Sequence, residues 1–188
     1  MTISSRRLLI APLLLAAVLA AGCGRAADSR AGAPAPKVNA CELFTEEDAQ
    51  GVAGDTLALM SSTLDDARGR NPLECIYNSG NLEQPRILSL LIRQHRNADE
   101  ARSLQESSRS TLSSMSGGQV QDVPGLGDGA VWVGGRIQQL HVLAGSQQLI
   151  ITVQSPDGTD QLPKARQIAT RSLERLKTAA AAQQKKRR

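Results

Sequence analysis

The sequence predicts a single α+β domain: an antiparallel β-sheet with helices packed on one face, stapled by one disulfide bond. Between residues 130 and 154, three β-patterned runs are separated by two-residue turns that contain glycine. Segments in which apolar residues recur at helical spacing lie before and after this block. Strands in sequence beside such helices are typical of an α+β fold. The chain has 188 residues, 40% of them hydrophobic, so one domain can bury a core.

The first predicted elements are a short helix and a weak strand. Thr45 can cap the helix, and the acids of Glu46–Asp48 suit the positive end of its dipole. Gly51 and Gly54 keep this helix short. The weak strand is predicted near 56–63.

A hairpin is predicted in the middle of the chain. Its strands are expected over 75–78 and 86–94, around a turn that contains Ser79-Gly80-Asn81. The run 87–92 is apolar on both faces, which favours a central strand.

A longer helix is predicted to follow the hairpin. Asn97-Ala98-Asp99-Glu100 is a capping signal at its start. Gly117-Gly118 ends the element. The apolar residues that recur between these signals at roughly helical spacing are Ala101, Leu104, Leu112 and Met115.

Three strands forming a meander are predicted over 130–133, 136–144 and 147–154. Gly134-Gly135 and Gly145-Ser146 separate them by two residues each, the spacing of tight hairpins. Such turns fix the register, so the two faces can be sorted. The more apolar face, which is expected to meet the helices, carries Val131, Val133, Leu140, Val142, Leu149, Ile151 and Val153.

The other face of the meander contains the candidate binding face, defined by Trp132, Ile137, His141 and Ile150. The predicted register makes Trp132 a cross-strand neighbour of Ile137, and His141 a neighbour of Ile150. One interpretation is a surface that binds a peptide, a lipid or a glycan. The other is a face that the first helix or the tether covers, or that stays exposed as a mixed surface.

The last helix is predicted over about 160–178, followed by a basic C-terminal tail, 179–188. Two interpretations of the tail stay open: a solvated tail that aids solubility, or a segment that binds anionic lipid, nucleic acid or an acidic cell-wall polymer. The apolar stripe of the helix is Leu162, Ala165, Ile168, Ala169, Leu173 and Leu176.

The net charge of the chain comes from its ends. The formal value is +4, and Arg6, Arg7 and the four cations of 185–188 contribute +6, which leaves −2 for the rest. A nucleic-acid-binding domain would carry its positive charge on the fold itself. The sequence therefore predicts no specific nucleic-acid partner.

The amino terminus predicts a signal peptide over residues 1–22. Arg6-Arg7 precede the 14 uncharged residues 8–21. As a helix this stretch would span about 21 Å at ~1.5 Å per residue, short of the ~30 Å hydrocarbon core of a bilayer. A positive start, a short apolar stretch and small residues before a cut define a signal peptide.

The end of this segment, Ala20-Ala21-Gly22-Cys23, resembles the lipobox of bacterial lipoproteins. The resemblance implies that Cys23 is S-diacylated and that the chain is cut before it, and two or three acyl chains anchor a protein stably in a membrane. Ala20 stands where leucine is commonest, and Leu19 lies one place earlier. Gly24, rather than Asp, follows Cys23; this implies the periplasmic face of the outer membrane in a two-membrane host. In a single-membrane host the resemblance implies the outer face of the cytoplasmic membrane.

The anchor leads into a predicted disordered tether, residues 23–39, and then into the α+β domain, 40–178. The tether is rich in Ala, Gly and Pro and lacks apolar periodicity. Its random-coil reach is roughly 20–24 Å, which holds the domain just off a membrane.

Cys41 and Cys75 are predicted to form a disulfide bond. An exported compartment permits disulfides, and two remaining cysteines suit one bridge. Closing this loop contributes roughly 3–4 kcal/mol on the chain-entropy model. A metal site needs more ligands, and His95 and His141 are not spaced for one, so no metal or cofactor is expected.

Three motifs of the mature part resemble a group of small, mostly uncharacterised bacterial envelope lipoproteins. They are Cys41–Asp48, Cys75-Ile76-Tyr77 and Val123–Asp128, the last before a meander and a final helix. Some members of the wider group are similar to PsbP-like α/β folds, which implies a scaffold and no catalytic residues.

These observations lead to a functional expectation and two alternatives. We expect a non-enzymatic binding or interaction module, anchored through Cys23, with an envelope protein or a cell-wall component as partner. One alternative is a carrier of a small ligand or lipid with an apolar pocket. The other is an envelope hydrolase, although His95 and His141 belong to no recognisable triad pattern.

Overall fold

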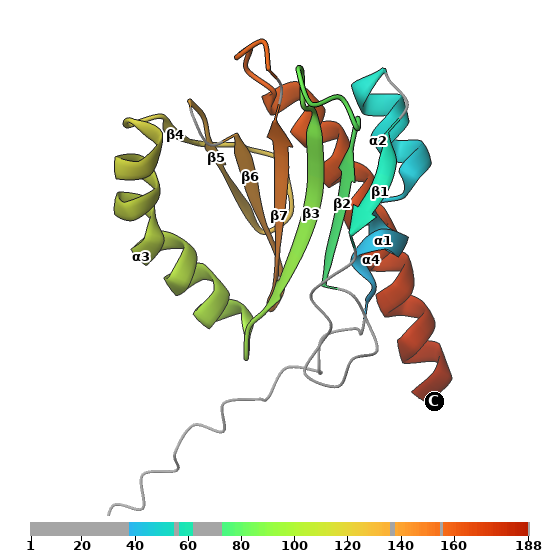
Figure 1. The fold of residues 1–188 in the computed structure, drawn as a ribbon. Helices are drawn as coiled ribbons and strands as arrows, with labels where there is room; N and C mark the ends of the chain where they lie inside the picture. The colour runs from blue at the N-terminus through green and yellow to red at the C-terminus, as the bar shows by residue number, and fades with distance from the viewer. Residues whose placement is uncertain (1–37, 55–56, 62–72, 136–137, 155, 188) are drawn as a thin grey trace, which may run out of the picture. The chain divides into compact units, whose positions relative to one another are not determined.

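A seven-stranded antiparallel β-sheet forms the centre of the described fold, in the order β1-β2-β3-β7-β6-β5-β4 (Figure 1). The computed structural model describes residues 38–54, 57–61, 73–135, 138–154 and 156–187. The antiparallel sheet and its helices confirm the predicted α+β class. The strands are β1 (Ala58–Ser61), β2 (Glu74–Asn78), β3 (Ile87–Gln94), β4 (Val120–Asp122), β5 (Gly129–Val133), β6 (Gln139–Ala144) and β7 (Gln147–Gln154).

The helices begin and end at the predicted capping residues where a local signal exists. Thr45 caps α2: its side chain accepts a hydrogen bond from the Asp48 N–H, and the Asp48 side chain accepts one from the Thr45 N–H. Asn97 caps α3, which ends at Gly117 in the left-handed region at φ 72°. The helices in the described residues are α1 (Ala40–Leu43), α2 (Glu46–Ala53), α3 (Ala98–Ser116) and α4 (Leu162–Arg187).

The strands confirm the predicted hairpin, the central strand and one of the two tight turns. β3 pairs with β2 on one side and with β7 on the other. Ala144 pairs with Gln147, so β6 and β7 turn through Gly145-Ser146 as predicted. β5 and β6 are joined differently, because Val133 pairs with Gln139 and five residues, 134–138, lie between them. The predicted two-residue turn at Gly134-Gly135 is therefore wrong.

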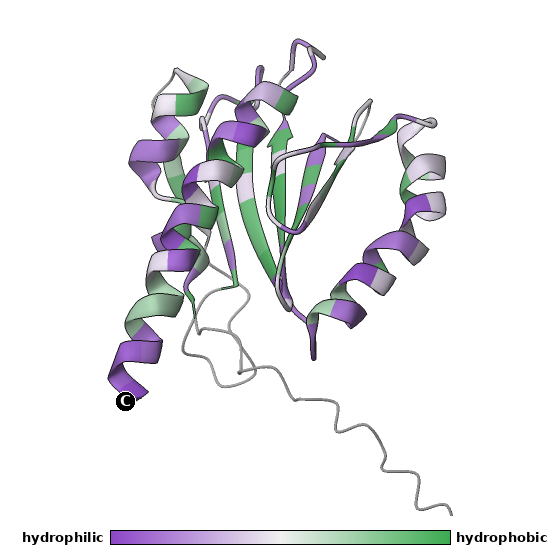
Figure 2. Ribbon diagram, turned by 180° about the vertical axis from the view of Figure 1, so that it is seen from behind, coloured by the Kyte–Doolittle hydropathy of each residue, from purple (hydrophilic) through white to green (hydrophobic). Residues whose placement is uncertain are grey.

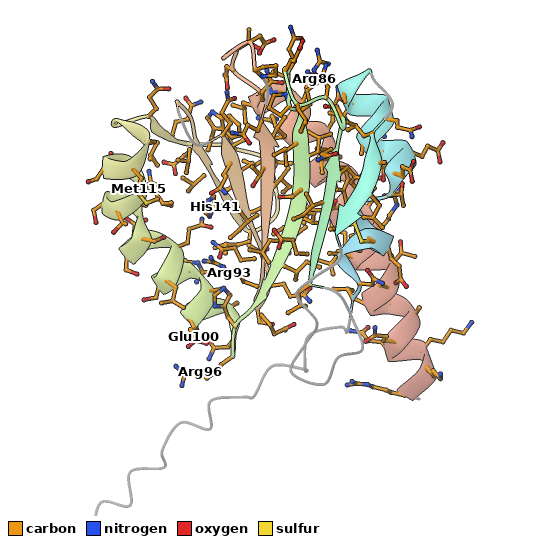
Figure 3. All side chains as sticks on the ribbon, in the orientation of Figure 1. Arg86, Arg93, Arg96, Glu100, Met115 and His141 are labelled. Carbon is orange, nitrogen blue, oxygen red and sulfur yellow. A yellow bond between two sulfur atoms is a disulfide. The ribbon has the colours of Figure 1, made fainter. Side chains whose placement is uncertain are left out.

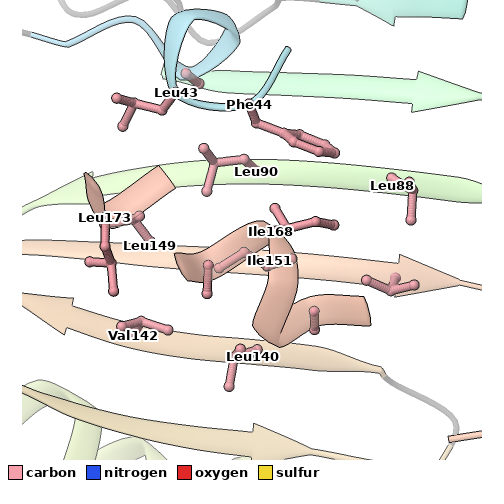
Figure 4. Packing of buried hydrophobic residues seen from close by; sticks show 14 of the residues in the cluster. Leu43, Phe44, Leu88, Leu90, Leu140, Val142, Leu149, Ile151, Ile168 and Leu173 are labelled. Carbon is pink, nitrogen blue, oxygen red and sulfur yellow. The ribbon is translucent and has the colours of Figure 1, made fainter. Parts of the chain in front are cut away.

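The main hydrophobic core lies between α4 and one face of the sheet (Figure 4). Leu90, Leu140 and Ile151 from three adjacent strands are fully buried there with Ile168 of α4. This burial follows from the alternation of side chains along each strand, which places these residues on one side of the sheet.

The segment around α1 closes the edge of this core. The Cys41–Cys75 disulfide, which joins α1 to β2, confirms the predicted bridge. The rings of Phe44 and Tyr77 meet edge to face, with centroids 5.2 Å apart. The Tyr77 hydroxyl donates a hydrogen bond of 3.0 Å to the Phe44 carbonyl oxygen. A covalent bond and a buried hydrogen bond thus hold the start of the domain on β2.

The helices do not all share one face of the sheet. α1 and α2 pack beside α4, on the face where the prediction placed the helices. α3 instead packs on the opposite face, over β4 to β7 (Figures 1 and 2). α3 connects β3, inside the sheet, to the edge strand β4, and it crosses the face that α4 leaves free.

The last helix is longer than predicted. α4 continues to Arg187, so described residues of the predicted tail, 179–187, are helical. Ala, Gln, Lys and Arg are strong helix formers, and cations in the last turn suit the helix dipole. In the part of the chain that the structure describes, no helix combines the length and apolarity needed to span a bilayer.

Several predictions lie outside the described residues. They are the signal peptide over 1–22, the lipidation of Cys23, the tether up to residue 37, and the position of Ile137.

Candidate functional site

The structure separates Trp132 from His141 and Ile150, the other described residues of the candidate binding face. Trp132 pairs with Leu140 and belongs to the main core on the α4 face. His141 pairs with Ile150, as predicted, and both lie on the α3 face. Trp132 and His141 therefore occupy opposite sides of the sheet, and the predicted pairing of Trp132 with Ile137 is wrong.

The error has a single physical cause in the turn between β5 and β6. The predicted two-residue turn would pair Trp132 with Ile137, whereas the longer connection pairs it with Leu140, three residues further along. When the pairing register shifts by an odd number of residues, every side chain of one strand moves to the other face of the sheet. Val131 and Val133 move to the α3 face by the same change, and Trp132 becomes 2% exposed within the core.

His141 lies buried between the sheet and α3, with Arg93 nearby (Figure 3). Burial lowers the pKa of His141 to about 4, and the positive charge of Arg93 adds to that effect. Among the described residues, His141 Nε2 has no hydrogen-bond partner. At neutral pH the side chain is therefore a neutral imidazole.

Two buried amides bridge α3 to the sheet beside this histidine. Gln148 Nε2 of β7 donates a hydrogen bond of 3.2 Å to Gln105 Oε1 of α3. Both residues are buried: Gln105 is 8% exposed and Gln148 is 5% exposed. The interior under α3 thus contains polar groups that the apolar pattern of the strands does not reveal.

A cavity of about 460 Å³ lies where the end of β5 meets the segment after α3. A Cβ at Gly134 would come 3.0 Å from Gln119 Oε1 and 3.2 Å from Trp132 Nε1, so the glycine keeps this space open. The lining is rich in amides, glycines and one carboxylate: Gly118, Gln119, Val120, Gln121, Trp132, Gly134, Gly135, Gln138, Gly158 and Asp160. Such groups can exchange hydrogen bonds with hydroxyl or peptide groups.

A second cavity, of about 440 Å³, lies beside α4. Leu173 and Leu176 of α4 line it, and Lys177 and Asp128 supply opposite charges. Gly127, also in the lining, has φ 54°, and a Cβ there would lie 2.1 Å from the Leu143 carbonyl oxygen. Gly127 of the Val123–Asp128 motif is therefore needed for the loop to approach the sheet.

The structure also contains an ion-pair cluster that the sequence analysis missed. Asp48 lies 6% exposed between Arg171, at 3.0 Å, and Arg175 of α4. Burial alone would raise the pKa of Asp48, but hydrogen bonds from Arg175, Thr45 and Arg171 outweigh it and lower that pKa to about 2. The partners lie more than 120 residues apart in the chain, so no local signal could have identified them. The cluster holds α2 on α4 and carries no reactive group.

Comparison with known proteins finds no family model, no curated protein and no solved structure that matches this chain. The resemblance to envelope lipoproteins rests on the sequence motifs alone. In the described residues, no three His, Cys, Asp or Glu side chains form a group that could hold a metal ion.

Proposed function

We propose that this chain is a lipid-anchored protein of the bacterial cell envelope whose α+β domain acts as a non-enzymatic binding module. The observation that carries the proposal is Ala20-Ala21-Gly22-Cys23 directly after an uncharged apolar stretch. Small residues before the cysteine suit cleavage, and a thiol is the nucleophile from which a thioether to a lipid forms. The disulfide Cys41–Cys75 is consistent with an oxidising, exported location.

The cavity beside Trp132 is the surface that we assign to binding. Its amides and its carboxylate Asp160 offer donors and acceptors in a confined space, as specific sites do. Gln119 and Gln121 are exposed at this cavity. We expect a ligand with hydroxyl or peptide groups, presented by an envelope protein or a cell-wall component.

Mass spectrometry of protein purified from its own membranes tests the anchor. We expect a polypeptide that begins at Cys23, lacks residues 1–22 and carries added acyl mass. The Cys23→Ser variant should stay unprocessed and lack the acyl mass. An unmodified chain, or a Cys23→Ser variant that matures normally, would contradict lipid anchoring.

Cross-linking and affinity purification of the lipidated protein test the binding module. Gln119→Ala/Gln121→Ala is expected to reduce recovery of the captured partner at least tenfold. The matched control is Gln84→Ala, an exposed glutamine away from the cavity, which should leave recovery unchanged. Equal recovery with all variants would contradict binding at this cavity.

The cavity lined by Leu173 and Leu176 favours a second candidate function, carriage of a small apolar ligand. Native mass spectrometry separates the two functions, because a carrier retains a small molecule and a binding module retains a protein or polymer. Hydrolysis of ester, peptide or glycan substrates that is lost on His141→Asn would contradict both.

A further inference from the structure

Charge is segregated within the described part of the domain. α4 contains eight Lys and Arg residues and one acid, Glu174. The described residues outside α4 contain five Arg residues and thirteen Asp and Glu residues. α4 is therefore the cationic element of an otherwise anionic domain.

Among the described residues, no acid forms an ion pair with the cations at the C-terminal end of α4. Arg171 and Arg175 pair with Asp48, nearer the middle of the helix. Within the described chain, no ion pair involves Lys177 or the cations of 185–187, and all four side chains belong to exposed residues. Their charge is thus available to a partner.

The cations of 185–187 lie on a stretch of α4 that leaves the sheet, whereas Lys177 lines the cavity beside α4. Leu176 is the last buried residue of the helix, and Ala179 still packs partly buried against the core. The eight residues after it, 180–187, extend about 12 Å at ~1.5 Å per residue. Figures 1 and 2 show this stretch running past the ends of the strands, and Figure 2 shows its last turns as hydrophilic. The helix dipole explains why cations are favoured in the last turn. It does not explain the cation at Lys177, or why the helix extends beyond the sheet.

The start of the domain lies beside the same helix. The Ser172 hydroxyl and the Arg175 guanidinium of α4 both donate to the Leu43 carbonyl oxygen, at 3.2 and 2.9 Å. Fourteen residues separate Cys23 from Val38, and even a fully extended chain of that length covers at most about 50 Å. A bilayer that holds Cys23 therefore lies within about 50 Å of Val38, at the start of the domain.

We propose that the projecting end of α4, which carries Lys185, Lys186 and Arg187, binds the surface of an anionic phospholipid bilayer and turns the anionic remainder of the domain away from it. The inference rests on the proposed anchoring at Cys23. The anchor favours lipid over other acidic partners, because it keeps the bilayer at a high effective concentration. Each cation at an anionic surface strengthens binding about fivefold, since it contributes roughly 1 kcal/mol.

The chain's single tryptophan, Trp132, allows a test with the mature lipidated protein. Energy transfer from Trp132 to a dansyl group on lipid headgroups reports how close the domain lies to the membrane. We would compare vesicles of phosphatidylcholine with vesicles that also contain phosphatidylglycerol. We expect higher transfer in the anionic vesicles, and loss of that increase in about 1 M salt, where the Debye length is about 3 Å.

Lys185→Glu/Lys186→Glu should abolish the increase, because removing two contacts weakens the attraction about 25-fold. The control is Arg96→Glu/Arg102→Glu, which makes the same charge change at exposed side chains just before α3 and in its first turns, on the opposite face of the sheet. The control should retain most of the increase. Circular dichroism checks that both variants keep the fold.

The outcomes separate this inference from the proposed function. Failure of the protein to co-sediment with neutral vesicles means that it is not anchored, which contradicts the proposed function. Two results overturn the inference alone. In the first, phosphatidylglycerol does not raise the transfer above that in neutral vesicles. In the second, the helix variant and the control variant reduce the increase equally. Capture of immobilised polyglutamate by the wild type but not by Lys185→Glu/Lys186→Glu, without a phosphatidylglycerol effect, assigns the helix end to an acidic macromolecule instead.

Discussion

The two faces of the sheet bury different kinds of interior, although the same strands supply both. In β6, Leu140 and Val142 point to the α4 face, whereas His141 and Leu143 point to the α3 face. All four residues are buried. The α4 face is a continuous apolar core, while the α3 face mixes apolar side chains with an imidazole and amides. Because buried polar groups offset part of the gain from burial, the α3 face should be the weaker half.

The largest expected difference between the faces comes from truncating leucines in one strand. Leu140→Ala should lower the free energy of unfolding by about 3–5 kcal/mol, because it opens a cavity in the dense α4 face. Leu143→Ala should lower the free energy of unfolding by about 2 kcal/mol, because α3 can shift toward the sheet and partly fill the cavity. Urea denaturation measures both. An equal or reversed order would show that the faces contribute alike.

The disulfide bond gives the next effect and acts only on the α4 side. Cys41→Ala/Cys75→Ala should lower stability by about 3–4 kcal/mol, because the unfolded chain regains the entropy of a loop closed over 34 residues. Thermal unfolding of the variant and of the reduced wild type should agree. A variant as stable as the oxidised wild type would mean that the α1 segment adds little to this face.

His141 should make the α3 face sensitive to mild acid. Its folded pKa of about 4 lies below the ordinary 6.5, so the unfolded chain takes up the proton first. Stability is therefore complete above pH 6.5 and falls by about 3 kcal/mol at most as the pH drops to 4. His141→Asn should remove this loss in denaturation measured across the same window. A loss that persists in the variant would assign it to other groups.

Asp48 should make the α4 side sensitive only to stronger acid. Its pKa falls from 3.8 to about 2 on folding, so its contribution is present above pH 3.8 and is lost as the pH falls towards 2. Asp48→Asn should cost about 2 kcal/mol at neutral pH and remove that acid dependence. The neighbouring, exposed Glu47→Gln is the control and should change stability little. Similar effects of the two changes would contradict a specific role of the ion pairs.

The smallest effect concerns the amide bridge under α3. Gln105→Ala removes the hydrogen bond from Gln148 and should cost about 1–2 kcal/mol, because it leaves a buried amide unpaired. Hydrogen exchange should show faster opening of α3 and unchanged protection of α4. Equal acceleration in both helices would mean that the faces unfold as one unit.

Local signals account for most of the elements that were predicted correctly. Thr45 and Asn97 cap their helices through hydrogen bonds within three residues of sequence, and Gly145-Ser146 makes a two-residue turn. Each of these interactions involves neighbours in the chain, so the residue types alone were sufficient.

The candidate binding face failed for a different reason. The glycines at 134 and 135 suggested a tight turn. In the structure Trp132 pairs with Leu140, and this register is stabilised because both residues pack in the core on the α4 face. That choice depends on side chains from distant strands and from α4. The sequence pattern contained two plausible registers and no local reason to prefer the correct one.

The amino-acid order alone thus determined the fold class, the starts of α2 and α3, the disulfide pairing and the basic character of the C-terminal segment, because hydrophobic patterning, short-range hydrogen bonds, cysteine number and composition decide them. Tertiary structure alone decided which face holds Trp132, that α3 covers the other face, that Asp48 meets Arg171 and Arg175, and that the basic end of α4 projects past the sheet. These outcomes depend on which surfaces exclude water together, and such contacts join residues far apart in the chain.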